Sequence, residues 1–252
     1  VLGEQSHTGA TVIADRKDAL LAAAMMIVAA RDVADEFTDK PRFVLGSVGP
    51  GTKLPSLGHV RFADVRDAYQ RQVEAMIDGG IDAVQIETCQ DLLQAKAAVI
   101  AAKRARAEAG IELPILVNVT VETTGTMLLG SEIGAALVAL EALGVDAIGL
   151  NCATGPTEMS EHLRHLSRHS RVPVTCMPNA GLPQLSKAGA VYPLTADELA
   201  AAHRTFITDY GLGLVGGCCG TTTEHLAEVV DMVRATTPGV RHPQHEAAVA
   251  SL

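Results

Sequence analysis

Three cysteines in glycine-rich surroundings are the residues of this sequence best suited to chemistry. Cys218 and Cys219 lie in the segment Gly-Gly-Cys-Cys-Gly-Thr, directly after one apolar run, and Cys152 lies in Asn-Cys-Ala-Thr-Gly-Pro, directly after another. The glycines let the backbone turn sharply and bring main-chain N–H groups close to a ligand. Three thiolates that converge from two strand ends would hold a soft cation such as Zn²⁺ and leave its fourth position open, as in catalytic zinc sites.

A structural interpretation of the same cysteines stays open on these residues alone. Cys152 could be a buried apolar residue, and Cys218 and Cys219 could be a structural pair, because the two segments are far apart in sequence. A redox role requires Cys152 as the partner, since adjacent cysteines rarely form a disulfide with each other. Cys89 and Cys176 also lie at strand ends but lack glycine neighbours, so we expect both outside the site.

Polar side chains follow several of the predicted strands. Glu87 ends an apolar strand, where a carboxylate either interacts with a helix N-terminus or holds a substrate ammonium group, and we favour the second interpretation. Asn118, Asn151 and Asn179 occupy similar positions. Each amide could bind a substrate or tie neighbouring loops together.

Two other patterns imitate functional sites. His162, His165 and His169 share one helix face, but their charged neighbours indicate a solvated outer face rather than a metal site. The glycine-rich stretch 46–53 imitates a phosphate-binding loop, but its Lys and Thr are transposed and Pro50 lacks the N–H that would hold a phosphate.

A unit of one helix and one strand repeats along the chain. We expect helices over residues 17–37, 64–78, 91–109, 131–143, 158–169, 196–210 and 223–236. Strands are expected from residue 42 and over residues 82–88, 114–119, 146–150, 173–177 and 212–215. Short apolar strands without alternation are typical of a parallel sheet buried on both faces. Units of about thirty residues suit a (β/α) barrel or a doubly wound sheet, and the polar and thiol groups at the strand ends favour the barrel.

Composition limits the function classes. A chain of 252 residues can form one large α/β domain. Its net charge of −9 argues against nucleic acid or an anionic membrane as a partner, and its longest apolar run, residues 19–30, is too short to span a bilayer. Five cysteines in a chain of this length favour a cytoplasmic protein over a disulfide scaffold.

Three segments together carry a resemblance to a known family. The segments that begin at Asn151 (Asn-Cys-Ala-Thr-Gly-Pro), Met177 (Met-Pro-Asn-Ala-Gly-Leu-Pro) and Gly216 (Gly-Gly-Cys-Cys-Gly-Thr) resemble the homocysteine-binding domain of thiol methyltransferases. The match is closest to this domain of cobalamin-dependent methionine synthases, over about residues 40–252. It implies a (β/α)₈ TIM-type barrel.

The resemblance also implies roles for individual residues. Cys152, Cys218 and Cys219 match the zinc ligands of the family, and Glu87 matches the acid that holds the amino group of homocysteine. Asn179 lies in a segment that matches the lining of the substrate pocket, and with Asn151 it completes the predicted substrate-binding set.

By the same resemblance, the thiol of homocysteine fills the fourth zinc position and accepts a methyl group from methylcobalamin, which gives methionine. Cobalamin and folate would be bound by other modules of the full-length chain. Two alternatives remain: a stand-alone homocysteine methyltransferase with a sulfonium donor, and a truncated zinc-binding barrel without turnover.

Family members begin with two further strand units, whereas six units are visible here. We therefore expect residues 1–236 to form a barrel domain that lacks its first two β/α units. Residues 237–252, with two prolines and two histidines, are expected to be a linker or tail toward a further module.

Overall fold

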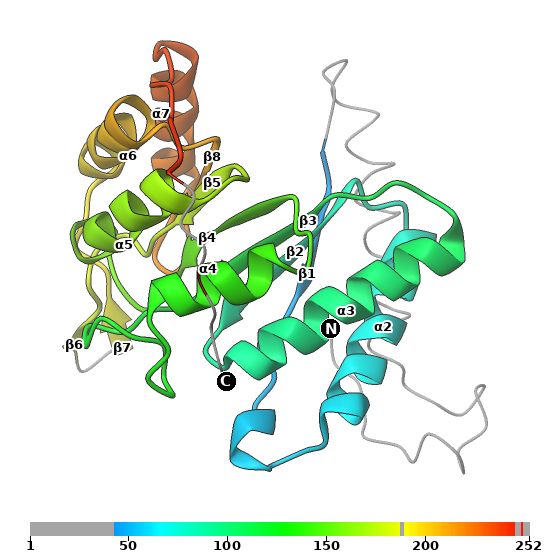
Figure 1. Cartoon of the computed structure of the whole chain (residues 1–252). Helices are drawn as coiled ribbons and strands as arrows, with labels where there is room; N and C mark the ends of the chain where they lie inside the picture. The colour runs from blue at the N-terminus through cyan, green and yellow to red at the C-terminus, as the bar shows by residue number, and fades with distance from the viewer. Residues whose placement is uncertain (1–42, 187–188, 245–247, 249–252) are drawn as a thin grey trace.

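The computed structural model describes residues 43–186, 189–244 and 248. Within these residues the chain forms an α/β fold in which parallel strands build one sheet and helices pack against it (Figure 1). The predicted helix over residues 17–37 lies outside the described residues. So does the N-terminal region in which we expected two β/α units to be missing.

Six parallel strands form an open half-barrel, and all six match predicted strands. In sheet order they are β1 (Leu45–Val48), β2 (Ala83–Cys89), β3 (Ile115–Val119), β4 (Ala147–Asn151), β5 (Val174–Met177) and β8 (Leu214–Val215). Spatial order follows chain order, as in a (β/α) barrel. Because all strands run the same way, the residues that follow them gather at one edge of the sheet.

Six α-helices in the described residues also match predicted helices. They are α2 (Phe62–Asp78), α3 (Leu92–Ala109), α4 (Ile133–Glu141), α5 (Pro156–His169), α6 (Ala196–Tyr210) and α7 (Thr223–Arg234). Helix α5 begins two residues earlier than expected because Pro156 occupies its first turn, where a missing N–H costs nothing. None of these helices is both long and apolar enough to cross a membrane.

Two short elements were not predicted. A 3-10 helix, η2 (Pro55–Leu57), follows β1, and an antiparallel hairpin of β6 (Gln184–Ser186) and β7 (Gly189–Val191) lies between β5 and α6. The sequence of the second region is rich in Gly, Pro and Asn, which is typical of a loop. Strand β7 is exposed, so it lacks the alternation of apolar and polar residues that marks a half-buried strand.

The two faces of the sheet differ in chemistry. Val84, Ile86 and their equivalents on the next strands join the main apolar core with the helices. The other face carries buried polar side chains: Gln85, Asn118 and Thr175, whose hydroxyl donates a hydrogen bond to Asn118 Oδ1. Gly149 lies on β4, between Asn118 on β3 and Thr175 on β5. A Cβ at this position would meet the Thr175 main-chain carbonyl oxygen at 2.0 Å.

We predict that Gly149→Ala lowers the free energy of unfolding by about 3 kcal/mol or more, because a backbone carbonyl cannot move aside as a flexible side chain can. Urea unfolding measures the change. Gly58→Ala is the control: Gly58 has a positive φ of 71° but nothing within 4 Å of an added Cβ, so only about 1 kcal/mol of backbone strain is expected. Equal losses in the two variants would contradict the close contact.

Candidate metal centre

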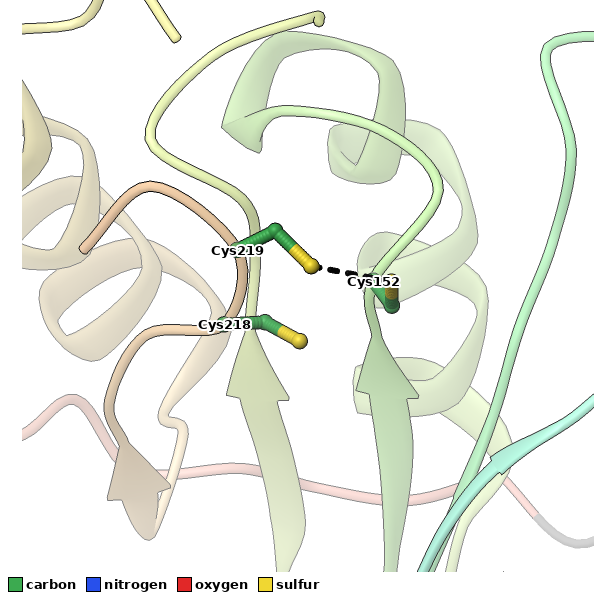
Figure 2. A group of neighbouring side chains, drawn as sticks. All are labelled: Cys152, Cys218 and Cys219. Carbon is green, nitrogen blue, oxygen red and sulfur yellow. Dashed lines mark hydrogen bonds between the residues drawn. The ribbon is translucent and has the colours of Figure 1, made fainter. Parts of the chain in front are cut away.

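The three cysteines of the two glycine-rich segments come together at the carboxyl edge of the sheet. Cys152 follows β4, Cys218 and Cys219 follow β8, and β5 lies between these strands. Figure 2 shows the three side chains converging, and their sulfur atoms all lie within 4.8 Å of one another. In the described part of the chain they form the one group of three or more Cys, His, Asp or Glu side chains with this geometry.

The backbone at Cys152 is strained in a way that aims its side chain. Cys152 and Ala153 have φ angles of 62° and 57°, in the left-handed region that costs non-glycine residues about 1–2 kcal/mol each. The Cys152 N–H donates to the Met177 carbonyl (3.2 Å), and the Thr154 N–H donates to the Cys152 carbonyl (2.7 Å). These bonds hold the turn, and the Cys152 sulfur lies 3.8 Å from that of Cys219.

The loop after β5 holds the loop that carries Cys218 and Cys219. The Cys218 N–H donates to the Pro178 carbonyl (2.8 Å), and the Cys219 N–H donates to Asn179 Oδ1 (3.1 Å). The Ala180 N–H in turn donates to the Cys219 carbonyl (2.9 Å). These three bonds fix both cysteines against the end of β5.

A buried histidine supports the same loop from behind. His203, on α6, is fully buried, and its Nε2 donates to the Gly216 carbonyl oxygen at 2.7 Å. Burial lowers the pKa of His203 to about 4, although the bond to Gly216 opposes this shift. The imidazole is therefore neutral at pH 7. The sequence patterns did not indicate this role, because His203 lies within an ordinary helix.

The thiols of the cluster have unequal acidity. The Cys218 thiol donates a hydrogen bond to the Cys152 sulfur, which is the main reason that the pKa of Cys152 is lowered to about 6. The same bond, with burial, raises the pKa of Cys218 above its ordinary value. Cys152 and Cys218 are half-buried, whereas Cys219 is exposed, so the cluster is open on one side.

The other two cysteines lie elsewhere, in the apolar core. Cys89 and Cys176 are both fully buried, and burial raises the pKa of Cys89 to about 12 and that of Cys176 further still. The structure therefore places these two thiols outside the cluster and disfavours their ionisation.

One amide side chain links the predicted substrate carboxylate to the cluster. The buried Asn151 Nδ2 lies 3.2 Å from Glu87 Oε2, 2.8 Å from Thr88 Oγ1 and 3.9 Å from Cys218 Sγ. Its Oδ1 accepts from the Thr88 N–H (2.7 Å), which supports the positive φ of 56° at Thr88. The Ser47 hydroxyl donates to the other oxygen of Glu87. Glu87 is thus held, half-buried, beside the thiols.

The remaining asparagines tie the scaffold together. Asn179 is buried, and its bond to Cys219 shapes the cysteine loop. Asn118 lies on the polar face of the sheet, where it accepts from Thr175 and its Nδ2 has no partner among the described residues. A direct contact of Asn151 or Asn179 with a substrate stays a prediction.

The histidines of α5 do not form a metal site. The rings of His165 and His169 lie 4.5 Å apart, yet no third ligand joins them within the described residues. Our expectation of a solvated face is wrong in part, since His162 and His165 are half-buried and burial lowers the pKa of each. His165 lines a cavity of about 480 Å³ between α4 and α5, which shares no residue with the thiol cluster.

The fold and the site define a class: barrel-type α/β proteins with function at the carboxyl edge of the strands. Within that class, residues 4–233 match the homocysteine S-methyltransferase family, and the chain belongs to this family. The resemblance noted from the three segments is thereby confirmed.

Curated relatives are much longer than this chain. It is 63% identical over 232 residues to the methionine synthase of Mycobacterium leprae (strain TN) and 62% identical over 225 residues to that of Mycobacterium tuberculosis (strain ATCC 25618 / H37Rv). These matches cover 89% and 88% of the chain but 19% of each relative. The chain thus spans about a fifth of the length of these proteins.

Solved structures support the fold. The apo form of the homocysteine methyltransferase MmuM from Escherichia coli matches with a TM-score of 0.62 and 21% identity, over 88% of this chain and 78% of that chain. Its metallated form matches with a TM-score of 0.58 and 22% identity, over 85% and 69% of the two chains. At this identity the likeness shows the shared fold alone.

We predict that His203 makes stability depend on pH. Its folded-state pKa of about 4 lies below the unfolded value of about 6.5, so the unfolded chain takes up the proton first as pH falls. This contribution is complete above pH 6.5 and is lost toward pH 4. Between pH 7 and pH 5 the parent should lose about 2 kcal/mol that His203→Gln does not lose, as measured by urea unfolding. His242→Gln, at an exposed position, should behave like the parent. An unchanged pH dependence in His203→Gln would refute the prediction.

Proposed function

We propose that this chain is the homocysteine-binding module of a methyl-transferring enzyme and that Cys152, Cys218 and Cys219 hold a zinc ion in it. The observation that carries the proposal is the convergence of three thiols at the carboxyl edge of the sheet, with Glu87 fixed beside them. Membership of the homocysteine S-methyltransferase family supports it.

The cluster fits a tetrahedral zinc ion. With Zn–S bonds of about 2.3 Å, tetrahedral geometry separates two ligand sulfurs by about 3.8 Å. The Cys152 and Cys219 sulfurs are 3.8 Å apart, and all three lie within 4.8 Å of one another. Three ligands leave one position for a substrate, and the exposure of Cys219 is in keeping with an open side. The low pKa of Cys152 favours the thiolate that a metal requires.

Zinc at this site would lower the pKa of the homocysteine thiol, so that the substrate sulfur is a thiolate at neutral pH. Three cysteine thiolates keep the site negative in total, which keeps that sulfur electron-rich. Glu87 supplies the counter-charge for the substrate ammonium group, and Asn151 holds both Glu87 and Cys218 in place. The side chains that bind the substrate sulfur and the substrate ammonium group are thus both held by the buried side chain of Asn151.

In the methyl transfer that we propose, one bond to the methyl carbon forms and one breaks. The thiol proton leaves when homocysteine binds, and an electron pair of the sulfur forms a bond to the methyl carbon of the donor. The bond between that carbon and the donor breaks, and its electron pair stays on the donor. The product is methionine, in keeping with the name methionine synthase of the relatives.

The donor we propose is methylcobalamin, bound by another module of a longer protein that also has a folate module. The 19% share of the relatives' length leaves room for such modules. Residues 1–236 would be the barrel domain and residues 237–252 the connection. Within the described residues this connection lies along α5 and α6, where Gln244 N–H donates to the Arg168 carbonyl (2.7 Å) and Gly239 N–H to the Ile207 carbonyl (2.9 Å). A cytoplasmic location, which keeps thiols reduced, completes the proposal.

The second candidate is a zinc-binding half-barrel without turnover. The observation that favours it is the open sheet, since β1 and β8 do not pair with each other within the described residues. A titration with zinc and then homocysteine separates the two, because a chain without turnover is expected to bind metal at most.

We predict about one zinc ion per chain, lost from Cys152→Ala, Cys218→Ala and Cys219→Ala, because two thiolates hold zinc much more weakly than three. Elemental analysis after dialysis measures the bound metal. Cys89→Ala is the matched control: this thiol is buried outside the cluster, so the variant should keep its zinc. A full equivalent of zinc in the Cys218→Ala/Cys219→Ala double variant would exclude the proposed site.

We also predict that Glu87→Gln weakens homocysteine binding to the zinc-loaded chain by about 10- to 100-fold, the cost of losing one charged hydrogen bond. Isothermal titration calorimetry gives the affinity. Glu122→Gln is the control, because Glu122 also acts electrostatically on Cys152 but bonds to Gln90 (3.2 Å). If both variants lose affinity equally, the effect is one of general charge and Glu87 does not contact the ammonium group.

A further inference from the structure

The β6–β7 hairpin is tied at its base to the cysteine loop. The Ala180 N–H, before the hairpin, donates to the Cys219 carbonyl (2.9 Å), and the Leu194 N–H, after it, donates to the Ala180 carbonyl (2.9 Å). His225 Nε2, on α7, donates to the Leu194 carbonyl (2.9 Å). The segment that leaves β7 is therefore held beside the cysteine loop in a defined position.

Tyr192, the residue after β7, occupies this position. Its ring lies against the main chain of Gly220, where an added Cβ would meet the ring carbon Cγ at 2.3 Å. Its hydroxyl is near enough to Cys219, Cys152 and Cys218 to interact with their charges. Gly220 has a φ of 79°, so both its conformation and the ring above it require glycine.

We propose that Tyr192 is a positioning residue of the metal centre, whose hydroxyl donates a hydrogen bond to the Cys219 thiolate. This proposal rests on the zinc site proposed above. It explains why an aromatic residue from a separate hairpin is held against Gly220, next to the most exposed of the three thiols. Nothing in the sequence motifs indicated this residue.

The other two sulfurs already have donors of their own. Hydrogen bonding from the Ala153 N–H helps to lower the pKa of Cys152, and the Asn151 amide Nδ2 lies 3.9 Å from the Cys218 sulfur. With Tyr192, each thiolate of the negative cluster has a hydrogen-bond donor of its own. Such donors draw electron density from a metal-bound sulfur and orient it, and losing one typically costs 10- to 100-fold in metal affinity.

Tyr192→Phe tests the proposal, because it removes the hydroxyl and keeps the ring on Gly220. We expect zinc affinity, measured by competition with a chromophoric chelator, to fall about tenfold. In the cobalt(II)-loaded protein we expect the thiolate-to-metal charge-transfer band to move to lower energy, since the Cys219 sulfur becomes more electron-rich. A merely structural residue would not shift this band.

Tyr210→Phe is the matched control, because it removes a hydroxyl that bonds to Ser160 (3.0 Å) on α5, among residues outside the thiol cluster. This variant should leave the zinc affinity and the cobalt(II) charge-transfer band unchanged. A parent-like affinity and band in Tyr192→Phe, with losses only in Tyr192→Ala, would reduce Tyr192 to a packing role and overturn the proposal. If the parent protein binds neither zinc nor cobalt(II), the proposed function is overturned instead. Failure of the Tyr192 proposal and failure of the proposed function are therefore distinguishable.

Discussion

The buried side chain of Asn151 is the interaction on which the rest of the site depends. It stands at the end of β4, and its single amide reaches Glu87 and Thr88 near the end of β2 and Cys218 after β8. A buried amide must satisfy both its donor and its acceptor atoms, because an unpaired one costs about 1–3 kcal/mol. The carboxylate and the thiol therefore cannot shift independently of each other.

Backbone strain is concentrated around the same point. Among the described residues, the non-glycine residues with positive φ are Thr88, Cys152 and Ala153, and all of them follow or end the strands that Asn151 connects. Such conformations persist where surrounding contacts over-determine them, and they cluster at functional sites. Here the strained backbone turns two strand ends toward the cluster. The packing of the parallel sheet offsets the free-energy cost of this strain.

The regular elements could be predicted from sequence because their signals are local. Apolar runs such as 147–150 and helix-ending glycines such as Gly110 mark strands and helices wherever the tertiary contacts lie. The β6–β7 hairpin could not be predicted, since both strands are short, β7 is exposed, and their position follows from bonds to the cysteine loop. The half-burial of His162 and His165 likewise arises from tertiary packing, near Gly125 and Gly134 respectively, which neighbouring charges in the sequence do not report.

The sequence by itself determined which residues could do chemistry and that parallel strands would bring them to one edge. Glycine-flanked cysteines after two apolar runs sufficed for this, because the carboxyl ends of parallel strands share an edge. Only the tertiary structure decided the distances between the thiols, the fixing of Glu87 by Asn151 and Ser47, and the placement of Tyr192 against Gly220 beside Cys219. These depend on hydrogen bonds between segments far apart in the chain, whose geometry no local pattern encodes.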